Sequence, residues 1–383
     1  MKTKHMQLKL SVLAVALCLS GTQAQAQSFT EVVQNALTIY PTMLSAKAKT
    51  DAQRSDIDRA RAAHMPQISY GYARSKYANT DLPASIKSNT RSPSVRLNLW
   101  SGGRIEADAE RAEALTLSSE QQEALTRDEV ALLAAEAYIN WARAMDMHEL
   151  ASKNLESHRI TLSDIQKIVD VDTGRRIDLE QAQVRMDNAS LAKLQRQTEL
   201  HQARQRLSRF WQASLPTKPV GLKEAFHPAG RLGPMPTTVD QVMDAVSDDL
   251  PSIAQQKAQV KAAEAAVSVA RGQYWPTVDL TSTRQLNPVA NGFTTTYKED
   301  TFTQVQLNMP LYSGGATSAA VQTAVGQLKA AQYGLDEARL LAKEKAALAY
   351  QEWMNAQGRA TQGESQARVG DKVVEGYQIG RAS

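Results

Sequence analysis

The sequence contains a single cysteine, Cys18, which lies in a short apolar stretch near the start. Three lysines precede that stretch, and the small-residue pattern Ala24-Gln25-Ala26 follows it. This order is typical of a secretory signal peptide, which we place at residues 1–26, so that the mature chain begins at or near Gln27. A lipid anchor on Cys18 is the alternative, but the bulky Leu17 stands where a small residue is expected. The mature chain then has no cysteine, which excludes disulfides and thiol chemistry.

Aromatic residues are also scarce, at 5% of the chain. No apolar run after the leader reaches the roughly 18–20 residues that a transmembrane helix needs. We therefore expect any membrane insertion to use β-strands. Alanine, glutamate, glutamine, leucine and arginine dominate instead, and this composition is typical of long helices and coiled coils.

Neither sign of charge predominates, because 44 basic and 40 acidic residues are interspersed for a net charge of +4. Nucleic-acid-binding proteins usually gather their basic residues into a stripe, and none is visible, so we expect no nucleic-acid partner. The six histidines are scattered, and the motifs of metalloproteases, serine hydrolases and phosphate loops are missing. We predict no catalytic, metal or cofactor-binding site, and hence a protein that is not an enzyme.

One short motif occurs twice, as Leu99-Trp100-Ser101-Gly102-Gly103-Arg104 and as Leu311-Tyr312-Ser313-Gly314-Gly315-Ala316. Each copy follows an alternating apolar stretch and precedes a long helical pattern, so the hydrophobic period changes from two to about 3.6 at the glycines. Paired glycines supply the backbone freedom for that change. A hairpin turn and a phosphate loop are the alternatives, but the GxxxxGK[ST] pattern of a phosphate loop is missing. We predict strand–helix junctions at Gly102, Gly103, Gly314 and Gly315.

The motif belongs to a longer internal duplication. Tyr138 and Trp141 match Tyr350 and Trp353 at the same offset of 212 residues that relates the two glycine motifs. Each copy is predicted to contain a helix, two strands and a long helix. We therefore divide the mature chain into repeat 1 at residues 27–215, a proline-rich linker at 216–236 and repeat 2 at 237–383.

Four segments alternate apolar and polar residues with the period of a β-strand, at residues 68–73, 95–99, 278–280 and 305–311. Half-buried strands of a soluble sheet are one interpretation. A transmembrane strand gives the same weak signal over about 9–11 residues. Aromatic residues, which favour membrane–water interfaces, also flank the junctions. With the signal peptide, this favours membrane strands, with interface aromatics at Trp100, Tyr274, Trp275 and Tyr312.

Long helices are predicted from residue 103 to about 170 and, as a return helix, from about 179 to 210. Leu155, Leu162 and Val169 repeat every seven positions, which indicates coiled-coil packing. Between the two helices, Gly174 is expected to be a left-handed C-cap. The pair Gly380-Arg381 repeats the pair Gly174-Arg175 near the end of the second long helix.

This layout resembles the outer-membrane factor family, the TolC-like exit ducts of Gram-negative secretion and efflux systems. The resemblance covers nearly the whole mature chain and rests on the two junction motifs, the prolines before the strands and the glycine-containing tips. It implies a mainly α fold with a membrane β part and an internal duplication. Long α-helical hairpins would form a periplasmic α-barrel tunnel, and four transmembrane β-strands per chain would contribute to an oligomeric β-barrel.

The resemblance also implies partners and site residues. It predicts a homotrimer in outer-membrane lipid that extends into the periplasm and meets a periplasmic adaptor (membrane fusion protein) bound to an inner-membrane transporter. Adaptor contacts are expected at the tips, at Gly174, Arg175, Arg176, Tyr377, Gly380 and Arg381. Candidate tunnel-constriction acids are Asp178 and Glu180.

The function implied is that of a passive duct for type I protein secretion or multidrug efflux, and general likeness favours type I secretion. The alternative is a non-channel periplasmic coiled-coil adaptor or scaffold, to which long helical hairpins alone would be suited. The four alternating strands with aromatic residues at their junctions argue for the duct.

Overall fold

The computed structural model describes residues 29–77, 86–211, 219, 236–291 and 294–382. The predicted signal peptide and almost all of the predicted linker lie outside the described residues. The chain divides into two compact units, one formed by residues 1–45 with 126–233 and the other by residues 46–125 with 234–383. Each unit therefore combines segments that are far apart in the sequence. The predicted repeat boundaries are a division of the sequence and stay a prediction.

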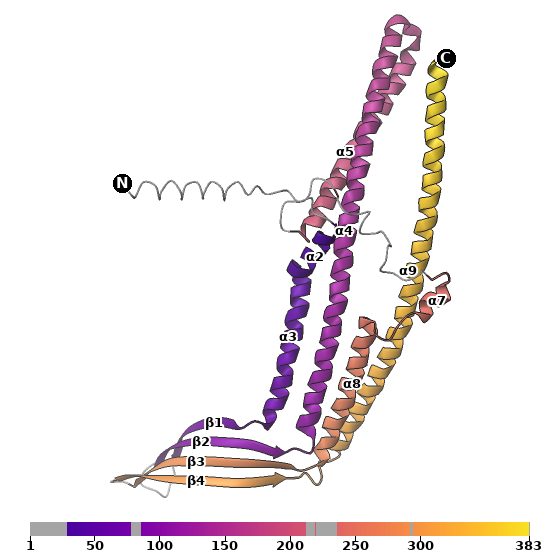
Figure 1. Ribbon diagram of the computed structural model, residues 1–383. Helices are drawn as coiled ribbons and strands as arrows, with labels where there is room; N and C mark the ends of the chain where they lie inside the picture. Colours follow the sequence, from indigo (N-terminus) through magenta and orange to yellow (C-terminus); the bar gives the residue numbers. More distant parts are fainter. Residues whose placement is uncertain (1–28, 78–85, 212–218, 220–235, 292–293, 383) are drawn as a thin grey trace, which may run out of the picture. The chain divides into compact units, whose positions relative to one another are not determined.

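An antiparallel sheet of four described strands belongs to the second unit (Figure 1). Its strands lie in the order β1 (Gln67–Tyr77), β2 (Ile86–Trp100), β3 (Thr277–Asn291) and β4 (Thr294–Asn308). Because β2 pairs with β3, the sheet joins strands from the two halves of the sequence. The strand predicted at residues 305–311 extends too far, since β4 ends at Asn308. Pro310 follows closely, and its nitrogen carries no hydrogen for strand pairing.

Each pair of strands is entered from a helix in the same way. The helices α3 (Pro41–Arg61) and α8 (Pro251–Arg271) continue into the short 3-10 turns η1 (Ala62–His64) and η3 (Gly272–Tyr274). The next residues, Met65 and Trp275, have extended backbones with ψ of 153° and 151°. Both precede a proline, which disfavours helical conformation in the residue before it. Pro66 therefore marks the change from helix to strand in the first half, and Pro276 does the same in the second half.

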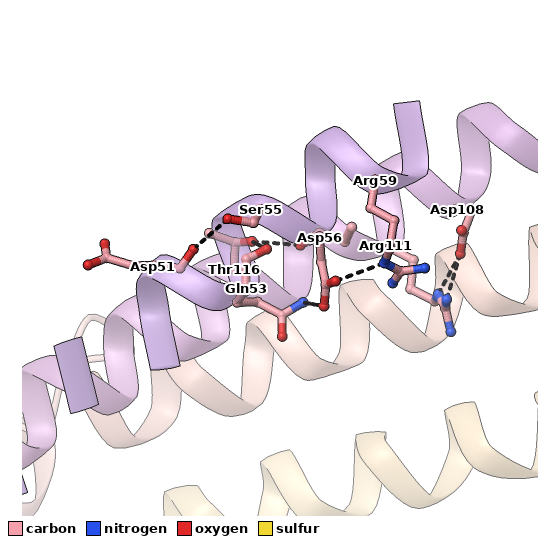
Figure 2. Close-up of polar contacts among 9 residues, drawn as sticks. Asp51, Gln53, Ser55, Asp56, Arg59, Asp108, Arg111 and Thr116 are labelled. Carbon is pink, nitrogen blue, oxygen red and sulfur yellow. Dashed lines mark hydrogen bonds and ion pairs between the residues drawn. The ribbon is translucent and has the colours of Figure 1, made fainter. Parts of the chain in front are cut away.

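Buried hydroxyl groups join α3 to the start of α4 (Arg104–Val171) within the second unit. Thr116 Oγ1 donates to the carbonyl oxygen of Gln53 at 3.1 Å, and Thr50 Oγ1 donates to that of Ser119 at 3.3 Å. Figure 2 shows Thr116 beside Gln53, among ion pairs that lie within each helix. Thr50 and Thr116 are both buried. Each hydroxyl also lies within hydrogen-bond distance of a carbonyl oxygen in its own helix, that of Ala46 for Thr50 and that of Ala112 for Thr116, so its single hydrogen is shared between the two helices.

An ion-pair cluster holds the turn between α7 (Val239–Asp244) and α8 against α9 (Ala316–Ala382). Arg339 on α9 donates from Nε and Nη2 to the two carboxylate oxygens of Asp248, at 3.1 and 2.8 Å. Lys257 Nζ lies 2.8 Å from the same carboxylate. Arg339 first, and then Lys257, hold the pKa of Asp248 well below its usual range. A small apolar cluster of Val267, Ala270 and Ala324 also packs in this unit, on α8 and α9.

The helices that follow the sheet are very long. α4 has 68 residues and α9 has 67, which corresponds to roughly 100 Å at about 1.5 Å per residue. α5 (Arg176–Ser208) follows α4 after the short turn η2 (Thr173–Arg175). These bounds confirm the helices predicted at residues 103–170 and 179–210. α9 stays helical past Gly380, so the described residues contain no chain reversal there, and the second tip stays a prediction.

The first unit has an aromatic core. α2 (Phe29–Ile39) brings Val32 to a cluster in which Tyr138, Trp141 and Leu207 are at most 1% exposed. Phe29 packs edge-on against Tyr138, with ring centroids 5.6 Å apart. A second cluster next along these helices consists of Ala36, Val130, Ala134 and Phe210. Apolar residues three or four apart on α2, α4 and α5 thus share one core, as expected for amphipathic helices.

Candidate functional site

One side of the sheet, which we call the apolar face, carries apolar residues on all four strands. The register sets Ile68 opposite Val95, and Leu280 lies between Leu97 and Val305 on the neighbouring strands. Ile68 is 81% exposed and Val305 64%. The apolar residues of this face are Ile68, Tyr70, Tyr72, Val95, Leu97, Val278, Leu280, Val305 and Leu307, and the hydrogen-bonded pair Ser282 and Thr303 lies among them. An exposed apolar surface that continues across several strands is typical of a site that contacts a membrane or another protein.

The opposite side, the polar face, carries hydroxyl, amide and charged groups. Ser69 and Ser94 lie opposite each other, with their Oγ atoms 2.7 Å apart. Phe302 is an apolar exception on β4 and is 61% exposed. The face is formed by Gln67, Ser69, Ser94, Arg96, Asn98, Thr277, Asp279, Thr281, Gln304, Gln306 and Asn308. A sheet with one apolar and one polar side can separate lipid from water.

The glycines at the predicted junctions have a left-handed backbone. Among the described residues, positive φ occurs at four glycines only: Gly102, Gly103, Gly314 and Gly315, with φ of 66°, 76°, 63° and 85°. Other residues rarely adopt this conformation, because the Cβ atom clashes with the backbone. At Gly102 the space is also closed, since a Cβ would lie 2.5 Å from Trp275 Cβ. The same atom at Gly314 would meet nothing within 4 Å.

The serine before each glycine pair begins the following helix, a role that sequence reasoning missed. Ser101 Oγ accepts a hydrogen bond from the backbone N–H of Ile105, and Ser313 Oγ accepts one from that of Thr317, both at 3.4 Å. Ser101 is buried, whereas Ser313 is exposed. Serine is a favoured residue for satisfying the free N–H groups at a helix start. The serine directly before each glycine pair was the signal in the sequence.

The four predicted interface aromatics lie at the helical end of the sheet, and all are exposed. Trp100 ends β2, and its ring meets that of Trp275 edge-on, with centroids 6.3 Å apart. Their exposed fractions are 41% for Trp100, 59% for Trp275, 50% for Tyr274 and 88% for Tyr312. The structure thus brings Trp100 and Trp275 together at the junction between strands and helices. Their contact with a membrane interface stays a prediction.

The prediction that Gly174 is a left-handed C-cap is wrong. Gly174 lies in the 3-10 turn η2 and is not among the glycines with positive φ. The turn instead depends on Asp172, whose Oδ1 accepts a hydrogen bond from the Gly174 N–H at 3.1 Å. Asp172 has the extended backbone of an N-cap, with φ of −125° and ψ of 92°. An aspartate two residues before a glycine is a common turn-forming pattern, and this was the signal in the sequence.

The charged residues of this tip are exposed, and one pair is joined. Arg175 Nε donates to Asp178 Oδ2 at 3.0 Å, so a candidate adaptor contact is bonded to a candidate constriction acid. Arg176 and Glu180 are exposed on the first turns of α5. Tyr377, Gly380 and Arg381 belong to α9, but their side chains lie outside the described residues. Adaptor and constriction roles are therefore still predictions.

No group of three or more histidine, cysteine, aspartate or glutamate side chains among the described residues lies close enough together to hold a metal ion. No helix in the described part of the chain is both long and apolar enough to cross a membrane.

Comparisons with known proteins agree on one family. The model of the outer membrane efflux protein family matches residues 32–211 and 244–378. The outer membrane efflux protein BepC of Brucella suis biovar 1 is 27% identical over 338 residues, which cover 85% of this chain and 70% of that protein. The probable efflux pump outer membrane protein TtgC of Pseudomonas putida is 24% identical over 226 residues, which cover 57% of this chain and 44% of TtgC.

Solved structures share the fold at lower identity. CusC, from a study of folding and transmembrane channel formation, superposes with a TM-score of 0.72 at 18% identity, over 88% of this chain and 79% of CusC. The open state of the Neisseria gonorrhoeae MtrE outer membrane channel gives a TM-score of 0.72 at 19% identity, over 89% of this chain and 77% of MtrE.

Proposed function

Because this chain belongs to the outer membrane efflux protein family, we propose that it forms the passive outer-membrane exit duct of a multidrug efflux pump. The family is one of outer-membrane channels rather than enzymes. The protein's place is accordingly the Gram-negative outer membrane, with its long helices extending into the periplasm.

The observation that carries the proposal is the two-sided sheet. Its apolar face exposes Ile68, Val305 and Leu307 by 64–81%, and its polar face carries paired serines and charged groups. Lipid would cover the apolar face, and water in the duct would hydrate the polar face. A periplasmic coiled-coil adaptor, the alternative function, does not need a sheet with one apolar and one polar face.

The strand number requires several copies of the chain. The smallest common membrane barrels have about eight strands, so the four described strands of one chain cannot close one. We propose the family's homotrimer, in which three chains contribute to one barrel and the long helices form the tunnel below it. The aromatics Trp100, Tyr274, Trp275 and Tyr312 would then mark the periplasmic edge of the bilayer.

The partners follow from the same proposal. Exposed Arg175 and Arg176 at the tip between α4 and α5 would contact a periplasmic adaptor bound to an inner-membrane transporter. Gly174 would shape that tip, Tyr377, Gly380 and Arg381 would form its counterpart, and Asp178 and Glu180 would face the tunnel near its entrance. These assignments rest on the position of the residues in the chain. Each lies at the end of a long helix, many residues away from the strands of the sheet.

The class of cargo follows from the relatives. BepC and TtgC are both described as efflux proteins, which supports efflux of small molecules over the type I protein secretion that the sequence analysis favoured.

Fractionation of cells that express the full chain tests the proposal. We expect the protein in the outer-membrane fraction, as an oligomer whose band moves to the monomer position only after heating. Recovery in the soluble periplasmic fraction after mild lysis would contradict the duct and favour the adaptor alternative.

A further inference from the structure

Two ion pairs cross the sheet, one on each of its faces. On the polar face, Arg96 of β2 donates from Nη2 to Asp279 Oδ2 of β3 at 2.8 Å. Near the middle of β3, on the apolar face, Arg284 pairs with Glu299 of β4. The sheet thus places two arginine–carboxylate pairs of similar chemistry on opposite sides.

The pair on the polar face is the more strongly held. Asn98 Nδ2 donates to the second carboxylate oxygen of Asp279 at 2.9 Å. The Asp279 side chain is only 14% exposed, while that of Arg96 is 63% exposed. Arg284 and Glu299 are 56% and 53% exposed. Asp279 is therefore fixed in place, with its compensating cation reaching into solvent.

The pair also lies beside a charged cleft at the helical end of the sheet. Besides Arg96 and Asp279, the charged residues that line this cleft are Arg104 and Asp108. Arg104 Nε donates to the carbonyl oxygen of Ser101, and Asp108 accepts from Arg111. The cleft lining thus carries two cations and two carboxylates, so that its charges balance.

We propose that Arg96 and Asp279 form a charge-balanced element on the wall of the duct, so that this part of the wall adds no preference for cations or anions. This inference rests on the proposed function, in which the polar face lines the water-filled lumen and occurs once per subunit. A wall charge raises the local concentration of the opposite ion, and a neighbouring charge of opposite sign cancels that field. Removing one partner would expose the other in every subunit.

Ion selectivity in planar lipid bilayers tests the pair directly. The purified full-length oligomer would be studied in a KCl gradient near 0.1 M, where the Debye length is about 10 Å. Arg96→Gln leaves Asp279 uncompensated, so we expect the K⁺ to Cl⁻ permeability ratio to rise by about twofold or more. Asp279→Asn should lower the ratio by a similar factor. The double variant should return towards the wild type.

Matched controls separate a lumen charge from a general effect of mutation. Arg284→Gln removes a similarly exposed arginine from the opposite face and should leave the ratio unchanged. Arg96→Lys keeps the charge and should also behave as the wild type. In about 1 M salt, where the Debye length falls to about 3 Å, the differences should shrink.

The outcomes distinguish this inference from the function on which it rests. If the wild-type oligomer forms no conducting channels, the proposed function itself fails. If channels form but Arg96→Gln and Asp279→Asn leave the ratio at the wild-type value, the duct stands and the pair does not balance its lumen. Should Arg96→Gln fail to assemble, the opposite shift expected of Asp279→Asn decides the matter alone.

Discussion

The same aromatic pair occurs in both halves of the chain, but only one copy is buried. Tyr138 and Trp141 are 0% and 1% exposed, and their rings meet edge-on with centroids 5.3 Å apart. In the matching pair, Trp353 is 40% exposed, and its ring lies 5.8 Å from that of Tyr350 in a tilted arrangement. The first pair is covered by Val32 of α2 and by Leu207 of α5. A duplicated sequence therefore repeats the helix face but not the environment of that face.

Truncation of the two tryptophans should give the largest difference between the halves. Trp141→Ala removes a fully buried indole and should lower the free energy of unfolding by about 3–5 kcal/mol. Trp353→Ala removes a partly exposed one and should cost below about 1 kcal/mol, as is usual near the surface. Thermal unfolding of the detergent-solubilised protein, followed by circular dichroism, measures both. Equal losses would mean that Trp353 is buried to the same extent in the assembled protein.

In the strands, by contrast, matching substitutions should have similar effects in the two halves, because the two halves are equivalent there. Val95 and Leu307 match at the offset of 212 and both lie on the apolar face. An arginine facing lipid near the middle of the bilayer costs about 2–4 kcal/mol, so Val95→Arg and Leu307→Arg should reduce the assembled oligomer to a similar degree. Gln306→Arg, on the polar face beside Leu307, is the control and should assemble normally. Normal assembly of all three variants would mean that the faces are wrongly assigned.

Substitution of the junction glycines should again destabilise the two halves unequally, but with a smaller difference in the free energy of unfolding. Gly102→Ala and Gly314→Ala both place a Cβ at positive φ, which costs about 1–2 kcal/mol. Only at Gly102 would that atom also meet Trp275 Cβ and the Gly272 carbonyl, at 2.5 and 2.8 Å. Thermal unfolding should therefore show a larger loss for Gly102→Ala. A loss at Gly314 as large as that at Gly102 would show that φ alone matters.

Substitutions at the tip should change the free energy of unfolding least, and they should impair transport without impairing assembly. The double variant Arg175→Glu with Arg176→Glu removes the exposed pair between Arg175 and Asp178, which is worth about 0–1 kcal/mol. We expect outer-membrane levels and oligomer formation to remain normal, while drug accumulation in cells rises severalfold because the adaptor contact is lost. Unchanged drug accumulation would show that the tip is only a turn.

Local sequence patterns predicted most of the fold, because strands and helices follow from the spacing of apolar residues and from punctuation by proline and glycine. The alternation at residues 95–99, the long helix from residue 103 to about 170 and the strand–helix junctions at Gly102 and Gly314 were all predicted in this way. These features depend on neighbours within a few residues.

Features that depend on distant residues could not be predicted. Arg96 pairs with Asp279, which is 183 positions away and is brought to it only by the pairing of β2 with β3. Burial of Trp141 but not Trp353 depends on the helices that cover them. Gly174 was misjudged because the side chain of Asp172 makes the turn, so that no left-handed residue is needed.

The central claim, that one face of the sheet meets lipid and the other meets water, can be tested with single cysteines. No cysteine follows Cys18, so Gln304→Cys, Val305→Cys, Gln306→Cys and Leu307→Cys each supply one labelling site on β4. With a fluorescent label and a quencher attached to lipid chains, we expect strong quenching at positions 305 and 307 and weak quenching at 304 and 306. A water-soluble quencher should give the reverse pattern. Equal quenching at all four positions by either quencher would contradict the account.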